Sequence, residues 1–339
     1  MKSKVININA RYYLSGQFIQ PWIAEEWTDQ DWANELNMMK SIGMEYLILT
    51  PIVYKDENKY YSVFYESSLA EFQGCEKNNL LEKCLRHCKA VGIKLFLDPY
   101  QDQQWWDYGW EWESSGPLSQ SGFRSYMTST RTLANKITDE ILLMYGHDYS
   151  DTIVGWYWGA EVWNIAMTGS DKYLKILSSG LNMALDHYSE VCPGKPMLMS
   201  PFVNTSLYGT SANKLYKQWK KIFSLTRFRN GDIICPQDSV GAGGMPFDDN
   251  GATLKLWTKA YADALATANV ELHFWSNNEN FTPEETPCSI ERFINQLKIT
   301  GPYVEKHVTY SYSEFYSPYQ VDPSNHEAYK IYLQSSEDF

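Results

Sequence analysis

The sequence lacks the patterns that identify several common classes of protein. No stretch approaches the roughly 18 consecutive apolar residues that span a bilayer, although hydrophobic residues make up 44% of the chain. Its six histidines form no His-x-His or His-Glu-x-x-His pattern, and its six cysteines form no Cys-x-x-Cys pair. These absences argue against a metal hydrolase, a zinc knuckle and a thioredoxin-type site. We therefore expect a protein without membrane insertion, metal or cofactor.

Signatures of phosphate binding and of serine hydrolases are also missing. The run Gly241 to Gly244 is glycine-rich, but it lacks the Lys-Ser/Thr pair of a phosphate loop and the full dinucleotide fingerprint, so it indicates a flexible loop. No Gly-x-Ser-x-Gly elbow occurs. The scattered cysteines, including Cys84 and Cys88 at helical spacing, are interpreted as small buried hydrophobic residues, and no disulfide is inferred from them.

Positive charge is scarce as well. With 29 Lys and Arg against 41 Asp and Glu, the net charge is −12, and such a surface repels nucleic acid backbones and anionic lipids. Aromatic residues are abundant instead, with 13 Trp and 25 Tyr, and many lie beside Gly, Asn, Asp and Pro. The composition favours a neutral substrate and an aromatic stacking surface, and it argues against nucleic acid as a partner.

The amino terminus begins with basic residues but has no apolar segment of the roughly 7–15 residues that a secretory signal requires. As written, the sequence predicts a cytoplasmic location. A periplasmic or secreted location follows instead if a signal segment has been removed.

Short apolar runs rich in β-branched or aromatic residues alternate with amphipathic stretches of helical period. This alternation is typical of parallel βαβ units, and eight such units close a barrel. The eight expected strands are Gln17 to Trp22, Tyr46 to Thr50, Ile93 to Asp98, Thr152 to Tyr157, Pro196 to Pro201, Asp232 to Pro236, Val270 to Trp275 and His307 to Tyr312. No repeat, low-complexity tract or proline-rich linker interrupts them. We predict an α/β protein, a single (β/α)8 TIM barrel domain over residues 1–339.

The connections between strands carry their own signals. Thr28 and Asp31 form a capping-box pattern at the start of an expected helix. The longest excursion joins the third and fourth strands, where the Trp-rich run Gln101 to Trp112 precedes a helix from about Leu118 to Tyr145. We expect this run to form a rim loop that places at least one of its tryptophans beside the cleft: Trp105, Trp106, Trp110 or Trp112.

Two glutamates stand where a barrel of this type carries its chemistry, at the C-terminal ends of strands. Glu161 follows the fourth expected strand and Glu279 follows the seventh, each among Trp and Asn residues. Glycoside cleavage needs one acid to protonate the leaving oxygen and one carboxylate to attack or to position water. Either glutamate alone could cap a helix or pair with an arginine, but together they are interpreted as the catalytic pair.

Other residues at strand ends are candidates for substrate binding. The tryptophans among them are interpreted as stacking platforms rather than core residues, because each lies beside a strand end. The three acids have second interpretations: Asp98 as a structural strand-end residue, Asp238 as a turn residue that caps the next helix, and Glu314 as the partner of a rim arginine. The candidates are Gln20, Trp22, Asp98, Trp158, Asn164, Gln237, Asp238, Trp275, Asn278, Tyr312 and Glu314.

Four separated segments, Gly16 to Trp22, Gly155 to Asn164, Pro236 to Gly241 and Phe274 to Glu279, resemble those of a bacterial family of glycoside-hydrolase-like barrels, domain of unknown function four-four-three-four. This resemblance covers nearly the whole chain. More remotely, the chain is similar to the clan A retaining glycosidases, whose acid/base follows the fourth strand and whose nucleophile follows the seventh.

The resemblance to clan A implies that Glu161 is the acid/base and Glu279 the nucleophile. Those enzymes place Asn directly before the acid/base, whereas here Ala160 precedes Glu161 and Asn164 follows it. We also expect the pKa of Glu161 to exceed that of Glu279, because apolar neighbours such as Trp163 disfavour the charged form and the charge of Glu279 adds to the effect.

Two functions fit these patterns. The first is a retaining glycoside hydrolase that acts on a neutral or mildly charged oligo- or polysaccharide. The second is a non-catalytic carbohydrate-binding barrel, in which the aromatic rim persists and the glutamates only hydrogen-bond sugar hydroxyls.

Overall fold

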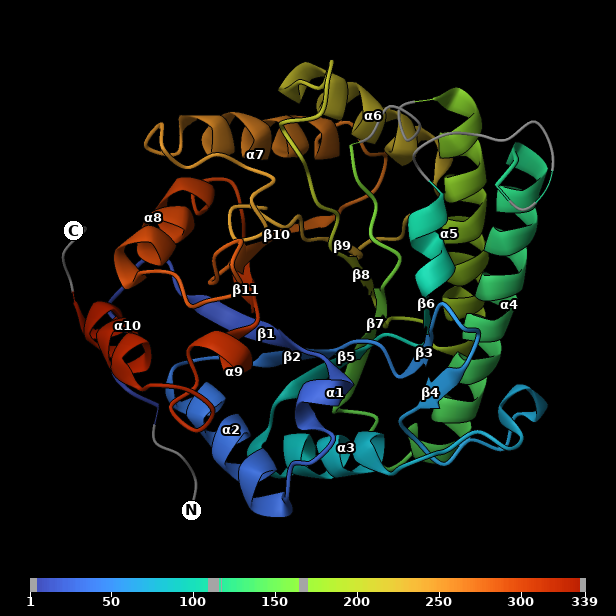
Figure 1. Ribbon diagram of the computed structural model, residues 1–339, viewed down its shortest axis with the longest axis horizontal. Coiled ribbons are helices and arrows are strands. Elements are labelled where there is room, and N and C mark those ends of the chain that lie inside the picture. The colour runs from blue at the N-terminus through green and yellow to red at the C-terminus, as the bar shows by residue number, and fades with distance from the viewer. Residues whose placement is uncertain (1–4, 109–115, 117, 165–169, 336–339) are drawn as a thin grey trace.

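The computed structural model describes residues 5–108, 116, 118–164 and 170–335, and its centre is a closed barrel of eight parallel strands (Figure 1). The order around the barrel is β1 (Leu14–Ile19), β11 (Lys306–Tyr310), β10 (His273–Glu279), β9 (Ile233–Ile234), β8 (Met197–Met199), β7 (Ile153–Trp158), β5 (Lys94–Leu97) and β2 (Tyr46–Leu49). Because β1 pairs with both β2 and β11, the sheet has no free edge. The (β/α)8 fold predicted from the sequence is confirmed.

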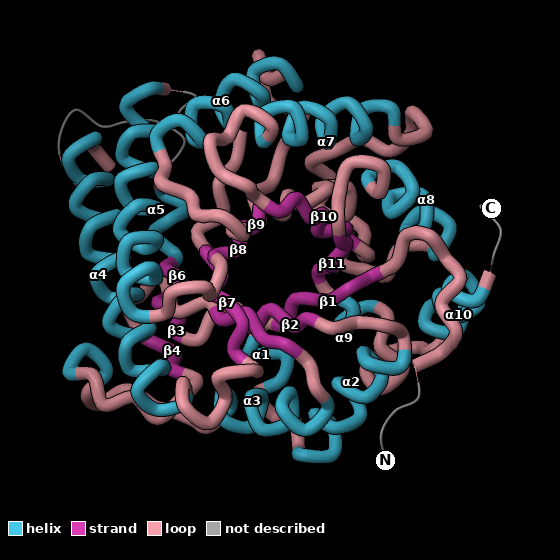
Figure 2. The backbone as a smooth tube through the Cα atoms, turned by 180° about the vertical axis from the view of Figure 1, so that it is seen from behind, coloured by secondary structure: helices cyan, strands magenta, loops and turns pink. Residues whose placement is uncertain are grey.

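Helices surround the barrel on all sides, as the view from behind also shows (Figure 2). The longer helices are α2 (Asp29–Ser41), α3 (Leu80–Val91), α4 (Gln120–Tyr145), α5 (Asp171–Val191), α6 (Ala212–Leu225), α7 (Ala252–Leu265), α8 (Ile290–Thr300) and α10 (Ser324–Gln334). Short helical segments are α1 (Pro21–Ala24), α9 (Tyr312–Phe315) and the 3-10 helices η1 (Ala70–Phe72) and η2 (Gln103–Asp107). None of the helices within the described ranges is long and apolar enough to cross a membrane.

All eight expected strands are present, and the differences lie at their ends. β1 ends at Ile19, because Pro21 begins the short helix α1. β10 begins later than expected and continues through Glu279, so this residue belongs to the strand itself. The expected capping box is present at α2, where the N–H of Asp31 donates to Thr28 Oγ1 and the N–H of Thr28 donates to Asp31 Oδ2.

A small second sheet, which the sequence did not predict, stands beside the barrel. It consists of β3 (Val53–Lys55), β4 (Tyr61–Val63) and β6 (Gln101–Asp102), in the order β4-β3-β6. Its strands come from the segments that follow β2 and β5, and the sheet lies next to α4 (Figure 1). It therefore extends one side of the C-terminal rim of the barrel.

The hydrophobic core has two parts, one inside the barrel and one between the barrel and the helices. The inner core takes at least one residue from every barrel strand: Phe18, Ile48, Phe96, Tyr157, Leu198, Ile233, Cys235, Trp275 and Val308. The outer core includes Cys84 and Cys88, which are buried as expected. All six cysteines are free in the described part of the chain.

Candidate active site

A cavity of about 340 Å³ opens at the C-terminal ends of the barrel strands. Side chains along a strand alternate between its two faces, so the residue two positions beyond an inner core residue again faces the barrel axis. Residues of this kind that line the cavity are Gln20, Thr50, Gly159, Gln237, Asn277 and Tyr310. Glu161, Glu279 and the rim residues named below also line this cavity, which we call the central cavity. Within the described ranges, no group of three or more His, Cys, Asp or Glu residues is arranged to hold a metal ion.

Glu161 enters the central cavity from the segment that follows β7. Its Oε1 accepts a hydrogen bond of 2.8 Å from Gln237 Nε2, and its backbone carbonyl accepts one of 2.9 Å from Trp105 Nε1. Burial raises the pKa of Glu161 to about 7, and the hydrogen bond from Gln237 opposes the rise only in part. The carboxyl group can therefore hold a proton near neutral pH.

Glu279, the last residue of β10, enters the same cavity. Its Oε2 accepts a hydrogen bond of 2.7 Å from the backbone N–H of Ala242, and its carbonyl oxygen accepts one of 2.9 Å from Gln296 Nε2. The turn reaches this carboxylate because residue 241 is glycine: a Cβ there would lie 2.9 Å from Glu279 Oε2.

Asp238 is buried behind Glu279, and it anchors the end of β10. Its carboxylate accepts hydrogen bonds from the side chains of Asn278 (2.9 Å) and Gln296 (2.6 Å). It also accepts from the backbone N–H groups of Val240 and Glu279, each at 3.2 Å. Asp238 therefore orients Glu279 from outside the central cavity, and it caps no helix.

The pKa values of Glu161 and Glu279 stand in the opposite order to the one expected from the sequence. Burial raises the pKa of Glu279 to about 8, and the neighbouring charge of Asp238 adds to the rise, while the Ala242 N–H opposes it. This value lies above the pKa of about 7 for Glu161. The expectation was wrong because the sequence did not reveal a buried carboxylate directly behind Glu279.

Aromatic rings stand at the mouth of the central cavity. Trp22 is 45% exposed and lines the cavity, with Tyr54 edge-on at a ring-centroid distance of 6.0 Å. Trp106 is 39% exposed, and it lines the cavity together with the buried Trp105. Two tryptophans of the expected rim loop therefore border the cavity, and the other two, Trp110 and Trp112, lie outside the described residues.

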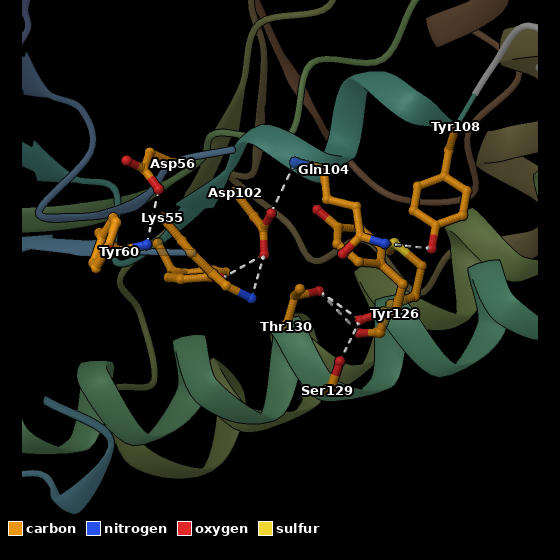
Figure 3. A network of polar contacts seen from close by, with 11 residues as sticks. Lys55, Asp56, Tyr60, Asp102, Gln104, Tyr108, Tyr126, Ser129 and Thr130 are labelled. Carbon is orange, nitrogen blue, oxygen red and sulfur yellow. Dashed lines mark hydrogen bonds and ion pairs between the residues drawn. The ribbon is translucent and has the colours of Figure 1, made fainter. Parts of the chain in front are cut away.

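A third carboxylate, Asp102, lines the cavity where the second sheet meets α4. It accepts hydrogen bonds from Tyr100 OH (2.7 Å) and from the N–H of Gln104 (2.8 Å), and one oxygen lies 3.7 Å from Lys55 Nζ. Figure 3 shows Lys55 and Asp102 directed toward each other, next to Tyr126 of α4. The charge of Asp102 is thus balanced locally by a lysine that does not itself line the cavity.

Three aromatic candidates belong to the core, which corrects their interpretation as substrate contacts. Trp158 is 2% exposed and faces outward from β7, where the Arg131 guanidinium lies over its ring. Trp275 faces inward but lies one layer below the cavity, among the rings of Tyr46 and Phe96. Tyr312 is buried in α9, and its OH shares a hydrogen bond of 2.9 Å with His326.

Four polar candidates also lie away from the lining of the central cavity. Asn164 fixes a loop, because its Nδ2 donates to the carbonyl of Asn204 and to Thr210 Oγ1. Asn278 points outward from β10, toward Asp238. Asp98 lies beneath the floor, accepting a hydrogen bond of 2.8 Å from Thr50 Oγ1. Glu314 is exposed, and among the described residues it has no ion pair with an arginine.

The cavity is also lined by residues that were not predicted from the sequence. Asn277 and Tyr310 share the strand face of Glu279 and Val308, respectively, so the two-residue alternation could have identified them. Tyr310 OH donates to Gln20 Oε1 at 2.6 Å. Arg131 reaches the cavity from the middle of α4, and no sequence motif marks it.

Comparison with known proteins gives a family and a fold. A family model described as domain of unknown function (DUF4434) matches residues 14–322. Among curated proteins, none matches the chain by sequence. Among solved structures, a protein from Bacteroides thetaiotaomicron VPI-5482 that carries the provisional name alpha-L-fucosidase is similar, with 18% identity and a TM-score of 0.74 over 97% of this chain and 94% of that chain.

Two further structures share the fold. An endo-1,4-beta-D-mannanase from Thermotoga petrophila RKU-1 has 13% identity and a TM-score of 0.59, covering 95% of this chain and 99% of that chain. An intracellular xylanase from Thermoanaerobacterium saccharolyticum JW/SL-YS485 has 13% identity and a TM-score of 0.52, covering 91% and 88%. These neighbours carry names of glycoside hydrolases, and at such identities the likeness establishes the barrel fold.

Proposed function

The chain belongs to the DUF4434 family, and from this starting point we propose that it is a retaining glycoside hydrolase with Glu161 as acid/base and Glu279 as nucleophile. The observation that carries the proposal is that both carboxyl groups line one cavity, at the ends of β7 and β10. This is the face on which barrels of this type carry their catalytic residues. The glycoside hydrolases among the structural neighbours support the same class of reaction.

The surroundings of the two carboxyl groups suit different roles. Burial raises the pKa of both groups, to about 7 for Glu161 and about 8 for Glu279, so between these values the pair holds one proton in common. The proposed cycle proceeds from the state in which Glu161 carries this proton and gives it to the departing glycosidic oxygen. Glu279 is ionised in that state, which the Ala242 N–H favours, and its carboxylate attacks the anomeric carbon to form a glycosyl ester. Glu161, now ionised, then takes a proton from the water that hydrolyses this ester.

The rest of the cavity supports an oligo- or polysaccharide as the substrate. The exposed rings of Trp22 and Trp106 offer flat apolar faces to the C–H side of a pyranose. Gln20, Gln237 and Asn277 place amide groups on the cavity wall, where they can hydrogen-bond sugar hydroxyls. Asn277 Oδ1 is buried and has no partner among the described residues, so a ligand hydroxyl would satisfy it.

A substrate screen followed by two alanine variants tests the proposal. Aryl glycosides and polysaccharides identify a cleaved substrate, on which Glu161→Ala and Glu279→Ala are compared. Glu279→Ala should lose turnover on all substrates, because no carboxylate remains to form the intermediate. Glu161→Ala should keep activity on nitrophenyl glycosides, whose leaving group needs little protonation, and azide should increase it and yield a glycosyl azide of retained configuration.

Glu314→Ala provides the matched control, because Glu314 is exposed and does not line the cavity. It should keep wild-type turnover. Wild-type turnover in both of the other variants would place the catalytic carboxylates elsewhere. Binding of several glycans without cleavage of any would favour the alternative, a carbohydrate-binding barrel.

A further inference from the structure

Arg131 is the only basic residue among the described residues that line the central cavity. It lies midway along α4 and is 6% exposed. Every other charged residue of the lining is acidic: Asp102, Glu161 and Glu279. A single guanidinium has therefore been brought to the wall of an otherwise acidic cavity, from a helix outside the barrel.

The guanidinium of Arg131 is held in place but has no hydrogen-bond acceptor. Its central carbon lies 4.4 Å from the centroid of the Trp158 ring, a cation–π contact that helps to hold the group in place. Among the described residues it forms neither a hydrogen bond nor an ion pair, and Nε is buried without a partner. An unsatisfied buried cation costs free energy, so the arrangement calls for a specific reason.

Asp98 does not supply the missing acceptor. Asp98 is buried, and the charge of Arg131 is near enough to favour its ionised form. No nitrogen of the Arg131 guanidinium, however, lies within 4.0 Å of an oxygen of the Asp98 carboxylate. The oxygens of Asp98 instead accept from Thr50 Oγ1 (2.8 Å) and from the N–H of Tyr100 (3.3 Å). Arg131, which lines the cavity, therefore has guanidinium N–H donors available to a ligand.

We infer that Arg131 binds the carboxylate of an acidic sugar, so that the preferred substrate of the central cavity is a glycan containing a hexuronic acid. The inference rests on the proposed function of the cavity. A guanidinium presents parallel N–H donors that match the two oxygens of a planar carboxylate. Asp102 and the negative charge that the Glu161–Glu279 pair retains would repel such an anion elsewhere in the cavity, so they restrict it to the position beside Arg131.

Calorimetric titration of the wild-type protein with simple sugars tests the inference without requiring catalysis. The probes are D-glucuronate, D-galacturonate and D-mannuronate, each compared with its neutral hexose. At least one uronate should bind about tenfold or more tightly than its hexose, as expected for hydrogen bonds to a charged partner. Arg131→Met should bring the two affinities together, and Arg131→Lys, which keeps the charge but loses the paired donors, should fall between.

The matched control is Arg86→Met, because Arg86 pairs with Asp29 on the outside of the protein. It should keep the wild-type preference. A merely structural role for Arg131 predicts that its loss weakens uronate and hexose binding alike. If Arg131→Met does not fold, Arg131→Lys decides the matter: an unchanged preference in that variant contradicts the inference, as does a wild-type protein that binds uronate and hexose equally.

The outcomes separate this inference from the proposed function. Preferential uronate binding that depends on Arg131, with no glycoside cleaved, supports the inference and rejects the hydrolase. Cleavage of neutral glycosides by a protein with no preference for uronates supports the hydrolase and rejects the inference.

Discussion

At the scale of single residues, Gly241 shows how closely the backbone approaches the proposed nucleophile. A Cβ at this position would lie 2.7 Å from Glu279 Cβ and 2.8 Å from the backbone oxygen of Phe281. Because a backbone atom blocks one side, Gly241→Ala should displace the Glu279 side chain. We expect kcat to fall by about 10²-fold, the loss that a misplacement of roughly 1 Å can cause. Steady-state kinetics of Gly241→Ala on a proven substrate measures this loss.

Gly194→Ala is the control for this substitution. Gly194 has a positive φ, of 87°, which Gly241 does not, and a Cβ there would meet nothing within 4 Å. This variant should lose some stability to backbone strain and keep its kcat. Equal kcat losses in both variants would mean that the effect of Gly241→Ala is not specific to Glu279.

Asp238 should influence the pH at which Glu279 ionises. Burial raises the pKa of Glu279 to about 8, and the negative charge of Asp238 adds to the rise, so Asp238→Asn should lower that pKa and move the acidic limb of the kcat/KM profile to lower pH. The wild-type optimum should lie between about 7 and 8, where the pair formed by Glu161 and Glu279 carries one proton. Glu314→Gln should leave the limb unchanged, and an unmoved limb in Asp238→Asn would contradict the assignment.

The alternation of side chains along a strand separates the candidates that face the cavity from those that point outward, and this separation can be predicted from the sequence. Once Glu279 faces the cavity, Asn277 must share its face and Asn278 must point the opposite way. Likewise, Tyr157 lies in the inner core, so Trp158 must point toward the helices. The apolar runs predicted the strands without assigning the inward and outward residues of each. The position of Arg131 could not be predicted from the sequence, because that residue reaches the cavity through the packing of α4.

At the scale of elements, Glu140 fastens the segment from Tyr65 to Ser68, which follows β4, to α4, the helix that carries Arg131. Its carboxylate accepts hydrogen bonds from Tyr65 OH (2.7 Å), from the hydroxyl of Ser67 (2.5 Å) and from the N–H (2.7 Å) and hydroxyl (2.6 Å) of Ser68. Glu140→Gln replaces an acceptor oxygen by a donor, so it should reduce the free energy of unfolding by about 1–3 kcal/mol.

The pH dependence of this loss has a definite sign. The hydrogen bonds to Glu140 hold its pKa below the ordinary value of 4.5, despite the opposing effect of burial. Its contribution is therefore present above pH 4.5 and is lost as the pH falls below that value. Urea unfolding of wild type and Glu140→Gln should give a difference that shrinks under acid, whereas the exposed Glu76→Gln should show little difference at any pH.

The elements also show where local sequence signals were sufficient. The capping residues Thr28 and Asp31 correctly marked the start of α2. The long amphipathic stretch predicted α4 with a start two residues too early. The second sheet was missed because β3, β4 and β6 have only two or three residues each. Such short strands carry no periodicity, and their pairing depends on the loops that the barrel brings together.

At the scale of the whole molecule, buried ionisable groups make stability depend on pH in two opposite ways. Burial lowers the pKa of His307 to about 3 and that of His326 to about 4, from an ordinary 6.5. The unfolded chain binds protons at these two histidines more readily than the folded protein does. Stability is therefore lost as the pH falls below 6.5. The raised pKa values of Glu161 and Glu279 act in the other direction, because these groups bind more protons when the protein is folded.

Between pH 6.5 and 8 the two glutamates should dominate this dependence. Their folded pKa values of about 7 and about 8 exceed the ordinary 4.5. The stability that this difference provides is complete below pH 4.5 and is lost as the pH rises through the folded values, by up to about 1.4 kcal/mol per group and pH unit. Urea unfolding should thus show wild type weakening from pH 6.5 to 8, and Glu161→Gln/Glu279→Gln, which cannot titrate there, weakening less. A double variant of exposed glutamates, Glu76→Gln/Glu291→Gln, should keep the wild-type slope; equal slopes in all three proteins would show that the central cavity does not hold these protons.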